Sequence, residues 1–558
     1  MASRRRLESL LILGMVAASL RAFAGCSSDN AGPATGGDQD ASSDAKVAAD
    51  VSRPPFGACA DAGVPMRSCT AKQCTQLVGE PAACVGEQCV KLKTPECQGL
   101  SGAFDDSNAV WIGSLINLSG ADTQNGLIRQ HSVELAVKEI NAAGGLYTAN
   151  GCGRLPLAYL SCDDANTLTN PDAGPEGGAL DRRAAAKHLA EELKVAGIMG
   201  AYNSNNTIEV ALNVTDPAKT LLFAPTAGAS DITTIANATA DGARLVWRTV
   251  PTDALQAKAI ATYGGAVEKE LNKQGTPLRA AIVNRGDAFG NGLRDGVKAA
   301  IMLNNMSWAQ NAAATPSRVL ELSYTPATVA TQAPGFVTQL TAFQPDIIFW
   351  FGLGEFVPNI TVPYESSNPT TKPIWISSGS GQRSELIAAC ATKPTLKARS
   401  RGTSPQVTTP LAQDFFNFRY KATYQDAPQL IFGQTQAYDA TYLIAYAAQA
   451  TKPTFAPVSS LEVARNMAKM VGGSMTVDVG PTGLKTALEA LRSGQTIDFN
   501  GASGPLDFDP AVGEAPGDYA VWCVRTDPNT NAPAYENVTG MIWRYKTNAL
   551  DGTFACPP

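Results

Sequence analysis

Short polar loops follow three apolar segments in the first half of the chain, and their side chains are suited to holding a small molecule. The loops are SGADTQ after residues 109–118, NSNNT at 203–207 and PTAGAS at 225–230. Each leads into a predicted helix, whose first N–H groups lack backbone partners and attract a polar or anionic group. The alternative is that these residues only cap their helices, but three such loops at one sheet edge favour a binding site.

Residues suited to catalysis are sparse. The sequence has two histidines, His131 and His188, both in helical patterns with polar neighbours, and we expect both on the surface. Neither belongs to a Ser/His/Asp order or a His-x-x-x-His pair. The carboxylates Asp163 and Asp164 suit glycoside hydrolysis, but a solvated strand end or a helix cap is the commoner use. The loop GDAFGNG lacks the full dinucleotide fingerprint. We therefore expect no enzyme, no cofactor and no metal ion.

The elements that must position these loops alternate between strands and helices. Residues 109–118 form a continuous apolar run, and residues 127–145 have helical apolar spacing that ends in Gly-Gly. Further apolar runs at 279–285, 346–352 and 373–379 are again separated by helical patterns. Strands separated by helices predict parallel sheets with helices on both faces. The predicted fold class is α/β, with two doubly wound parallel-sheet lobes joined by crossover strands and preceded by a small cysteine-rich module.

The N-terminus predicts export. Three arginines at 4–6 precede an apolar stretch at 10–20 that is too short to span a bilayer. Ala24 and Gly25 before Cys26 resemble a bacterial lipobox, in which the cysteine thiol receives a diacylglycerol. The alternative is an ordinary signal cut near AFA, with Cys26 incidental. The polar residues that follow cannot bury enough apolar surface to order themselves, so they predict a tether.

Cysteine usage fits an oxidising compartment. Six cysteines crowd into about forty residues: Cys59, Cys69, Cys74, Cys84, Cys89 and Cys97. Three disulfides are the default expectation for a module this small. Zinc is the alternative, because the Cys69/Cys74 spacing recurs at Cys84/Cys89. Cys152 and Cys162 flank a predicted turn and strand and could close a local loop. If Cys26 is acylated, eleven cysteines remain, and one thiol is free or pairs outside the chain.

The charge of the chain limits its partners. A formal net charge of −6 without a basic block argues against nucleic acid or an anionic membrane surface. No second apolar run reaches transmembrane length. We expect contact with a membrane through a lipid anchor only, and a location in the periplasm or at the cell surface of a bacterium.

Several stretches together resemble a known family. They are IGSLINLSGADTQNG, SVELAVKEINAAGGL, LSCDDA, IMGAYNSNNTIEVA, VWRTVPTDALQAKAIA, AAIVNRGDAFGNGLRDGVKAA and FNGASGPLDFDPAVGEAPGDYAVW. In this order, over about residues 108–525, they resemble the branched-chain amino-acid (leucine-type) substrate-binding proteins of ABC importers, which have the type I periplasmic binding protein fold. The resemblance implies two lobes, three crossover segments and closure around a ligand.

The resemblance also implies site residues. Ser204 matches a serine that binds the ligand carboxylate, and Thr226 and Ala227 match residues whose backbone groups do likewise. Phe289 and Leu353 replace tyrosines, Asn125 replaces an aromatic residue, Gly228 replaces a threonine that grips the amino-acid head, and Ser378 replaces a glutamate that takes the ammonium. The predicted ligand-binding set is completed by Ser119, Asn205 and Asp287.

The missing glutamate argues against leucine itself. A buried ammonium without a counter-charge costs several kcal/mol. Asp287 or Glu355 could supply that charge instead.

The predicted organisation has seven parts. They are a lipoprotein signal at 1–25, a disordered tether at 26–55, the cysteine-rich module at 56–100, lobe 1 at 108–248, lobe 2 at 249–380, segments crossing between the lobes at 381–525 and a C-terminal extension at 526–558. We expect an extracytoplasmic solute-binding lipoprotein that clamps a small polar or amino-acid-like ligand and delivers it to an ABC importer permease. The alternative is a sensor module that binds its ligand without transport and signals to another membrane protein.

Overall fold

The computed structural model describes residues 68–120, 122–165, 180–235, 239, 241–407, 409–427 and 430–557. The predicted signal, the tether, Cys26 and Cys59 lie outside these residues. All described residues belong to one compact unit, Ser52–Pro558. In this described part of the chain, no helix has the length and apolar character needed to cross a bilayer.

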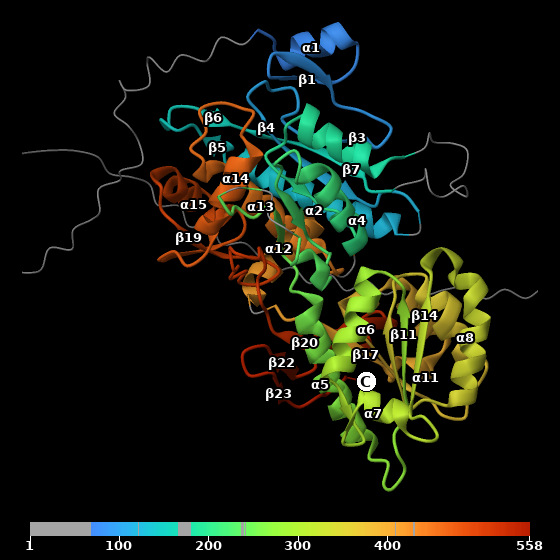
Figure 1. The fold of residues 1–558 in the computed structure, drawn as a ribbon. Coiled ribbons are helices and arrows are strands. Elements are labelled where there is room, and N and C mark those ends of the chain that lie inside the picture. Colours follow the sequence, from blue (N-terminus) through green and yellow to red (C-terminus); the bar gives the residue numbers. More distant parts are fainter. Residues whose placement is uncertain are drawn as a thin grey trace, which may run out of the picture. The chain divides into compact units, whose positions relative to one another are not determined.

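Lobe 1 is built on a six-stranded sheet in the order β10-β9-β8-β4-β7-β3. Figure 1 labels three of its strands, β3, β4 and β7. Its strands are β3 (Cys97–Gly102), β4 (Val110–Ile116), β7 (Leu157–Asp163), β8 (Ile198–Met199), β9 (Leu222–Ala224) and β10 (Val246–Arg248). All neighbours are parallel except β3, which runs antiparallel to β7 at the edge. The strand order reverses between β4 and β8, and ligands bind beside such a switch point in open α/β sheets.

Helices cover both faces of this sheet. They are α2 (Thr123–Ala142), α3 (Arg182–Lys187), α4 (Ser204–Val210), α12 (Pro410–Thr423), α13 (Gln434–Ala450), α14 (Ser460–Asn466) and α15 (Pro481–Ser493). One core joins α2, α12, α13 and α15 to one face, and a second core joins α3 and α4 to the other. Every residue of α13 is buried, although this helix comes from the last third of the chain.

Lobe 2 has a nine-stranded sheet in the order β14-β11-β15-β16-β17-β20-β22-β23, with β21 paired to β20. Its strands are β11 (Ala280–Arg285), β14 (Val319–Tyr324), β15 (Ile347–Phe351), β16 (Ile374–Ser377), β17 (Ser400–Pro405), β20 (Tyr519–Thr526), β21 (Pro533–Glu536), β22 (Met541–Arg544) and β23 (Ala549–Gly552). The first five strands are parallel and repeat the order of lobe 1, whereas the last four are antiparallel.

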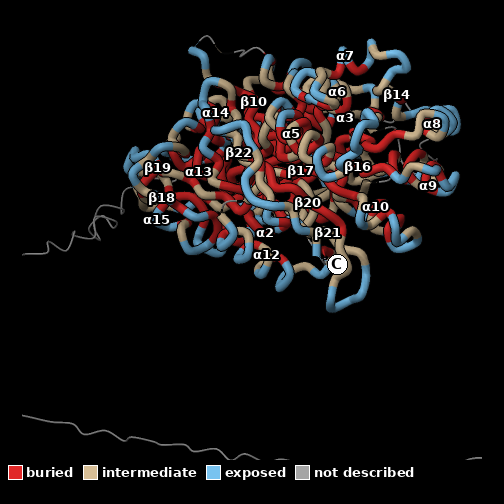
Figure 2. The backbone as a smooth tube through the Cα atoms, turned by 90° about the horizontal axis from the view of Figure 1, so that it is seen from below, coloured by how far each residue is buried: buried red, intermediate tan, exposed pale blue. Residues whose placement is uncertain are grey.

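The helices of lobe 2 also lie on both faces of its sheet. They are α5 (Asp253–Leu271), α6 (Ala288–Ala300), α7 (Trp308–Ala313), α8 (Val329–Phe343), α9 (Val362–Ser366), α10 (Ser384–Thr392) and α11 (Pro394–Lys397). Buried residues run through both lobes and mark their cores (Figure 2). The chain passes between the lobes three times, from β10 to α5, from β17 to α12, and from β19 (Ile497–Asn500) to β20. The predicted two-lobed α/β fold is confirmed.

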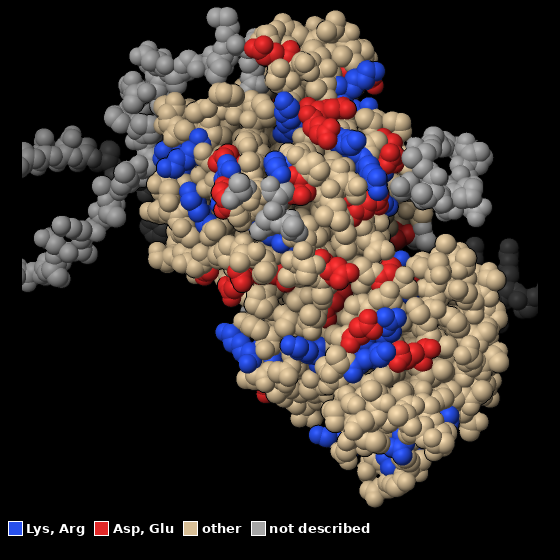
Figure 3. Space-filling view, in the orientation of Figure 1, with Lys and Arg blue, Asp and Glu red and all other residues tan. Residues whose placement is uncertain are grey.

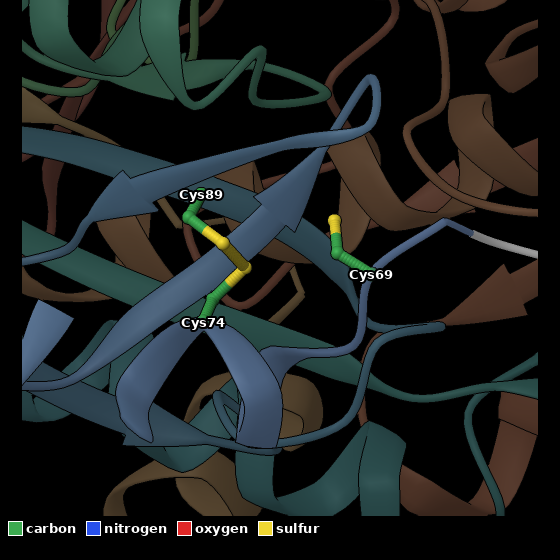
Figure 4. A group of neighbouring side chains, drawn as sticks. All are labelled: Cys69, Cys74 and Cys89. Atoms are coloured by element: carbon green, nitrogen blue, oxygen red, sulfur yellow. A yellow bond between two sulfur atoms is a disulfide. The ribbon is translucent and has the colours of Figure 1, made fainter. Parts of the chain in front are cut away.

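The described part of the cysteine-rich module consists of α1 (Ala71–Val78), β1 (Ala82–Val85) and β2 (Gln88–Lys91). Disulfides join Cys69 to Cys84 and Cys74 to Cys89, each pair 15 residues apart. Figure 4 shows the Cys74–Cys89 bond with Cys69 beside it. The zinc alternative is therefore wrong for these cysteines, because disulfide sulfurs are not thiolate ligands.

A third disulfide links the module to lobe 1. It joins Cys97 in β3 to Cys162 in β7, so the expected loop between Cys152 and Cys162 is wrong. At the other end of the chain, Cys523 in β20 bonds Cys556. Among the described residues the free thiol is that of Cys390, which is buried.

Two expectations about surface residues are wrong. His188 is only 4% exposed, because its ring nitrogens contact Glu192 and the backbone oxygen of Leu92. Asp163 and Asp164 are also buried rather than solvated. Their carboxylates accept backbone N–H groups of neighbouring loops and so hold the ends of β4 and β8 together.

Candidate ligand-binding site

A cavity lies where the two lobes meet, at the carboxyl ends of their parallel strands. The space between the atoms of its wall amounts to about 550 Å³ when the part that is open to solvent is included. Its lining residues are Arg129, Tyr202, Asn203, Ser204, Thr226, Gly228, Val250, Asp253, Gln256, Asp287, Phe289, Leu353, Ser378, Ser380, Arg383 and Phe432. Loops after β8 and β9 supply the lobe 1 side, and loops after β11, β15 and β16 supply the lobe 2 side. This is where open parallel sheets bind ligands.

Most of the residues predicted from the sequence come together here. Seven line the cavity: Ser204, Thr226, Gly228, Asp287, Phe289, Leu353 and Ser378. Four predicted residues do not line it, namely Ser119, Asn125, Asn205 and Ala227. Asn125 donates a hydrogen bond to Asp122 at 2.6 Å, and the Asn205 side chain accepts one from the Ala288 N–H at 3.1 Å, across the lobes.

Two hydroxyl groups on the lobe 1 side are already oriented. Ser204 begins α4, and its Oγ accepts the N–H of Ala229 at 3.2 Å. The hydroxyl proton of Ser204 is not used in that bond and remains available to a ligand. Thr226 donates its hydroxyl to the backbone oxygen of Tyr202 at 2.5 Å, which fixes the loop after β9 against the loop after β8.

Arginines from both lobes meet in the cavity wall. Arg383, in the loop after β16, donates to Asp122 at 2.9 Å and to the Tyr202 hydroxyl at 3.0 Å. Arg129 of α2 donates twice to the backbone oxygen of Phe432 and lies over the Tyr202 ring at 4.8 Å. Burial alone would raise the pKa of Asp122, but the two arginines hold it at about 2. Asp122 is therefore ionised and links the lobes electrostatically.

The acids expected as alternative counter-charges have partners within lobe 2. Arg285 donates to Asp287 at 2.5 Å and to Glu355 at 3.0 Å. Asp287 also caps α6 by accepting the N–H of Gly290. Glu355 accepts from the Tyr324 hydroxyl and does not line the cavity. Both carboxylates are therefore already paired with the same arginine of lobe 2.

Asp253 is the acid of this wall that sequence reasoning missed. It begins α5, is 3% exposed, and its Oδ2 has no hydrogen-bond partner among the described residues. Burial raises its pKa to about 7, opposed by the nearby Arg248 and assisted by Asp287. In the sequence, Asp253 stood out only because it follows the crossover residues VPT. An acid at this position is equally explained as a favourable first residue of a helix.

Arg129 and Arg383 were missed as well. Arg129 stands in a predicted helix, where a cation normally faces water. Arg383 closes the loop SSGSGQR after a predicted strand, and this position at a strand end was the one available signal. Outside the cavity, acidic and basic groups are interspersed over the face of the molecule shown in Figure 3.

The comparisons with known proteins agree with this architecture. A family model described as periplasmic binding protein matches residues 109–528, and the chain belongs to this family. No curated protein matches the chain.

Solved structures share the fold. One is the branched-chain amino acid transporter substrate-binding protein of Streptococcus pneumoniae in complex with isoleucine, at 18% identity and TM-score 0.54, with 77% of this chain and 99% of that chain covered. A leucine-binding protein from Thermotoga maritima has 14% identity and TM-score 0.53, covering 77% and 98%. A solute-binding protein of an ABC transporter from Rhodopseudomonas palustris in complex with 3,4-dihydroxybenzoic acid has 15% identity and TM-score 0.53, covering 77% and 96%. At these identities the likeness concerns the fold alone, and the predicted type I periplasmic binding protein fold is confirmed.

Proposed function

We propose that the chain is an extracytoplasmic solute-binding lipoprotein that closes two lobes around a small polar or amino-acid-like solute and delivers it to an ABC importer. The observation that carries the proposal is the cavity whose wall is shared between the lobes, with Arg383 of lobe 2 paired to Asp122 of lobe 1. Binding without turnover agrees with the family, whose members are solute-binding proteins.

Closure follows from the geometry of the cavity. A solute in it contacts residues of both lobes, such as Ser204 on one side and Phe289 on the other. A ligand that contacts both lobes only in the closed form shifts the population towards that form. The solute-free protein therefore samples more open arrangements, and the three connections between the lobes act as the hinge.

The anchor belongs to the same proposal. Acylation of Cys26 would hold the mature chain on a bacterial membrane, and the polar residues up to 55 would let the folded part reach a permease. Mass spectrometry of the mature N-terminus tests this part directly. The expected result is a Cys26 that carries a diacylglyceryl group. An unmodified N-terminus generated near AFA would contradict the anchor but would leave the binding proposal unaffected.

Two measurements test the binding itself. Native mass spectrometry of protein purified from its own host should reveal a retained small molecule, and X-ray scattering should show a more compact particle with that molecule than without it. An identical particle in both states contradicts closure.

Ser204→Ala tests the proposed contact on lobe 1. Loss of the hydroxyl that faces the cavity should weaken binding of the retained molecule by about 1 to 3 kcal/mol, if that hydroxyl donates to a charged group. Unchanged affinity contradicts a ligand contact at this position.

A further inference from the structure

One face of α12 carries large apolar side chains that remain exposed. Leu411, Phe415 and Phe418 are 62%, 54% and 74% exposed, and they are three of the eight exposed large apolar residues of the described chain. The opposite face of this helix is buried in the core of lobe 1 through Phe416 and Tyr420. Large apolar side chains that are exposed together mark an interaction site on a soluble protein.

These residues form a seam along the helix, here called the α12 stripe. Residues 411, 415, 418 and 422 follow one another at intervals of four, three and four, and Ala422 is exposed like the other three. Alternation of these intervals keeps a seam on one side of a helix, as it does in helices that pack on one another in coiled coils. The spacing therefore favours another helix as the partner.

The α12 stripe is complementary to itself when one copy is reversed. If two copies of α12 pack antiparallel about a twofold axis midway between Phe415 and Phe418, Phe415 of each copy lies opposite Phe418 of the other. Leu411 then lies opposite Ala422, so a large residue meets a small one at both ends. Aromatic pairs and pairs of large and small residues pack closely. One register therefore uses all four positions of the stripe.

The charges beside the α12 stripe fit the same register. Asp414 and Lys421 are exposed, and each directly precedes a residue of the stripe, so both lie along the same flank of the helix. In the antiparallel pair this flank meets itself in the reverse direction, which brings Asp414 of each copy near Lys421 of the other. The third charged residue of α12, Arg419, already donates to Glu139 at 2.8 Å. One free acid and one free base do not favour an anionic lipid surface, which attracts basic helices.

We propose that the α12 stripe is a docking surface for a second copy of this chain, which binds it through its own α12 in the antiparallel register. A contact between two 14-residue helices is small beside the about 1,600 Å² that stable complexes bury, so the dimer dissociates on dilution. Confinement of the chains by the proposed anchor would raise their local concentration and favour pairing. Because α12 belongs to lobe 1, the pairing leaves lobe 2 free to close.

Light scattering over a series of concentrations tests the pairing, using the full mature chain with Cys26→Ser so that acylation does not cause association. The parent should shift from monomer to dimer as the concentration rises. Phe415→Ser and Phe418→Ser should each raise the dissociation constant of the dimer about 10-fold or more. Phe455→Ser, at an exposed phenylalanine outside α12, is the matched control and should leave this constant unchanged. Thermal unfolding establishes that each variant is folded.

Charge exchange tests the register. Asp414→Lys and Lys421→Asp each place like charges opposite each other at both ends of a pair of identical chains. Each variant alone should therefore dimerise about 3-fold or more weakly than the parent. An equal mixture of the two variants restores opposite charges at both ends, and its dimer should be as strong as that of the parent. Contact of the stripe with a different protein or with a membrane would not produce this rescue.

The outcomes decide the inference. A monomer at every concentration up to about 1 mM, a dimer that Phe418→Ser does not weaken, or a mixture that pairs no better than its components overturns it. Binding of a monomeric parent to phosphatidylcholine vesicles, abolished by Phe418→Ser, also overturns it and assigns the stripe to a lipid surface. The proposed solute-binding function stands in all of these cases, because no residue of the stripe lines the cavity.

Discussion

Two segments outside the region matched by the family model are each attached to a lobe by antiparallel strands and a disulfide. They contact different parts of the two lobes. The N-terminal module adds the antiparallel strand β3 to lobe 1 and is held by Cys97–Cys162. The C-terminal segment adds β21, β22 and β23 to lobe 2 and is held by Cys523–Cys556. Each disulfide connects an added strand or tail to a strand of the sheet.

The two segments differ in whether their hydrogen bonds reach a residue that lines the cavity. Those of the module reach Ser107, Asp163, Asp181 and His188, and none of these four residues lines the cavity. In the C-terminal segment, the Tyr535 hydroxyl lies 2.6 Å from both the backbone N and the backbone O of Arg383. It lies 3.2 Å from the oxygen of Gly381.

The difference indicates two roles for similar additions. The module stabilises the edge of lobe 1, whereas the C-terminal segment positions the loop whose arginine crosses to lobe 1. A segment outside the family region thus supports a residue of the cavity wall.

Removing each disulfide should have the largest effect. The double variants Cys97→Ser/Cys162→Ser and Cys523→Ser/Cys556→Ser release loops with sequence separations of 65 and 33. Each should lower the free energy of unfolding by about 4 kcal/mol, measured by denaturant titration. Hydrogen exchange should show faster exchange of residues 378–385 in the second variant only. Equal acceleration in both variants contradicts the distinction.

Asp164 should give lobe 1 a pH-dependent stability. Burial raises the pKa of this carboxyl to about 6, although Asn206 and Arg182 partly oppose the shift. In the unfolded chain the carboxyl of Asp164 has a pKa of about 3.9. The folded state therefore binds the proton of Asp164 more tightly than the unfolded state does. Proton binding by Asp164 therefore adds to the free energy of unfolding below about pH 4, and this contribution is lost as the pH rises through 6.

Asp164→Asn removes this titration. The difference of roughly two pKa units corresponds to a loss on the order of 3 kcal/mol between pH 4 and 7 in the parent chain. The free energy of unfolding, measured by denaturant titration at several pH values in this range, should change less with pH in the variant than in the parent chain. Asp414→Asn, at an exposed acid, is the control and should keep the slope of the parent. An unchanged slope in Asp164→Asn contradicts the assignment.

Tyr535→Phe should affect the cavity more than the fold. The variant keeps the ring packed on Trp522 and removes only the hydroxyl that contacts the Arg383 backbone. A loss of about 1 to 2 kcal/mol is expected in the affinity for the solute retained from the host, with faster hydrogen exchange at Arg383. Tyr545→Phe, in the same segment, is the matched control. Equal effects of both variants would show that the segment acts only through general stability.

The fold was largely predictable because its parallel strands are buried on both faces. The continuous apolar runs at 109–118 and 346–352 are typical of strands that are buried on both faces, and polar loops mark their ends. The antiparallel strands β3 and β21 to β23 were not recognised as sheet members. They are short, and their residues are mostly half-exposed, so the apolar pattern that predicts buried strands is absent.

The loops of the site were predictable, but its charges were not. Ser204 and Thr226 follow strands directly, so their place at the sheet edge follows from the strand pattern alone. The burial of Arg129 depends on the backbone oxygen of Phe432, which lies 303 residues further along the chain. A contact of that kind leaves no signal in the local sequence, because the helix around Arg129 has the same pattern whether the arginine faces water or another segment.

Asn205→Ala should have the smallest effect and separates two kinds of contact between the lobes. Asn205 Oδ1 accepts the Ala288 N–H at an exposed position, and no C-terminal residue supports this bond. A typical hydrogen bond contributes about 0.5 to 1.5 kcal/mol, and this one is exposed, so solute affinity should fall by about 13-fold at most. Combining Asn205→Ala with Tyr535→Phe should give the sum of the single effects, because the two contacts share no partner. A double variant whose loss differs from that sum by more than about 0.5 kcal/mol would show that the C-terminal segment controls closure as a whole, rather than only the position of Arg383.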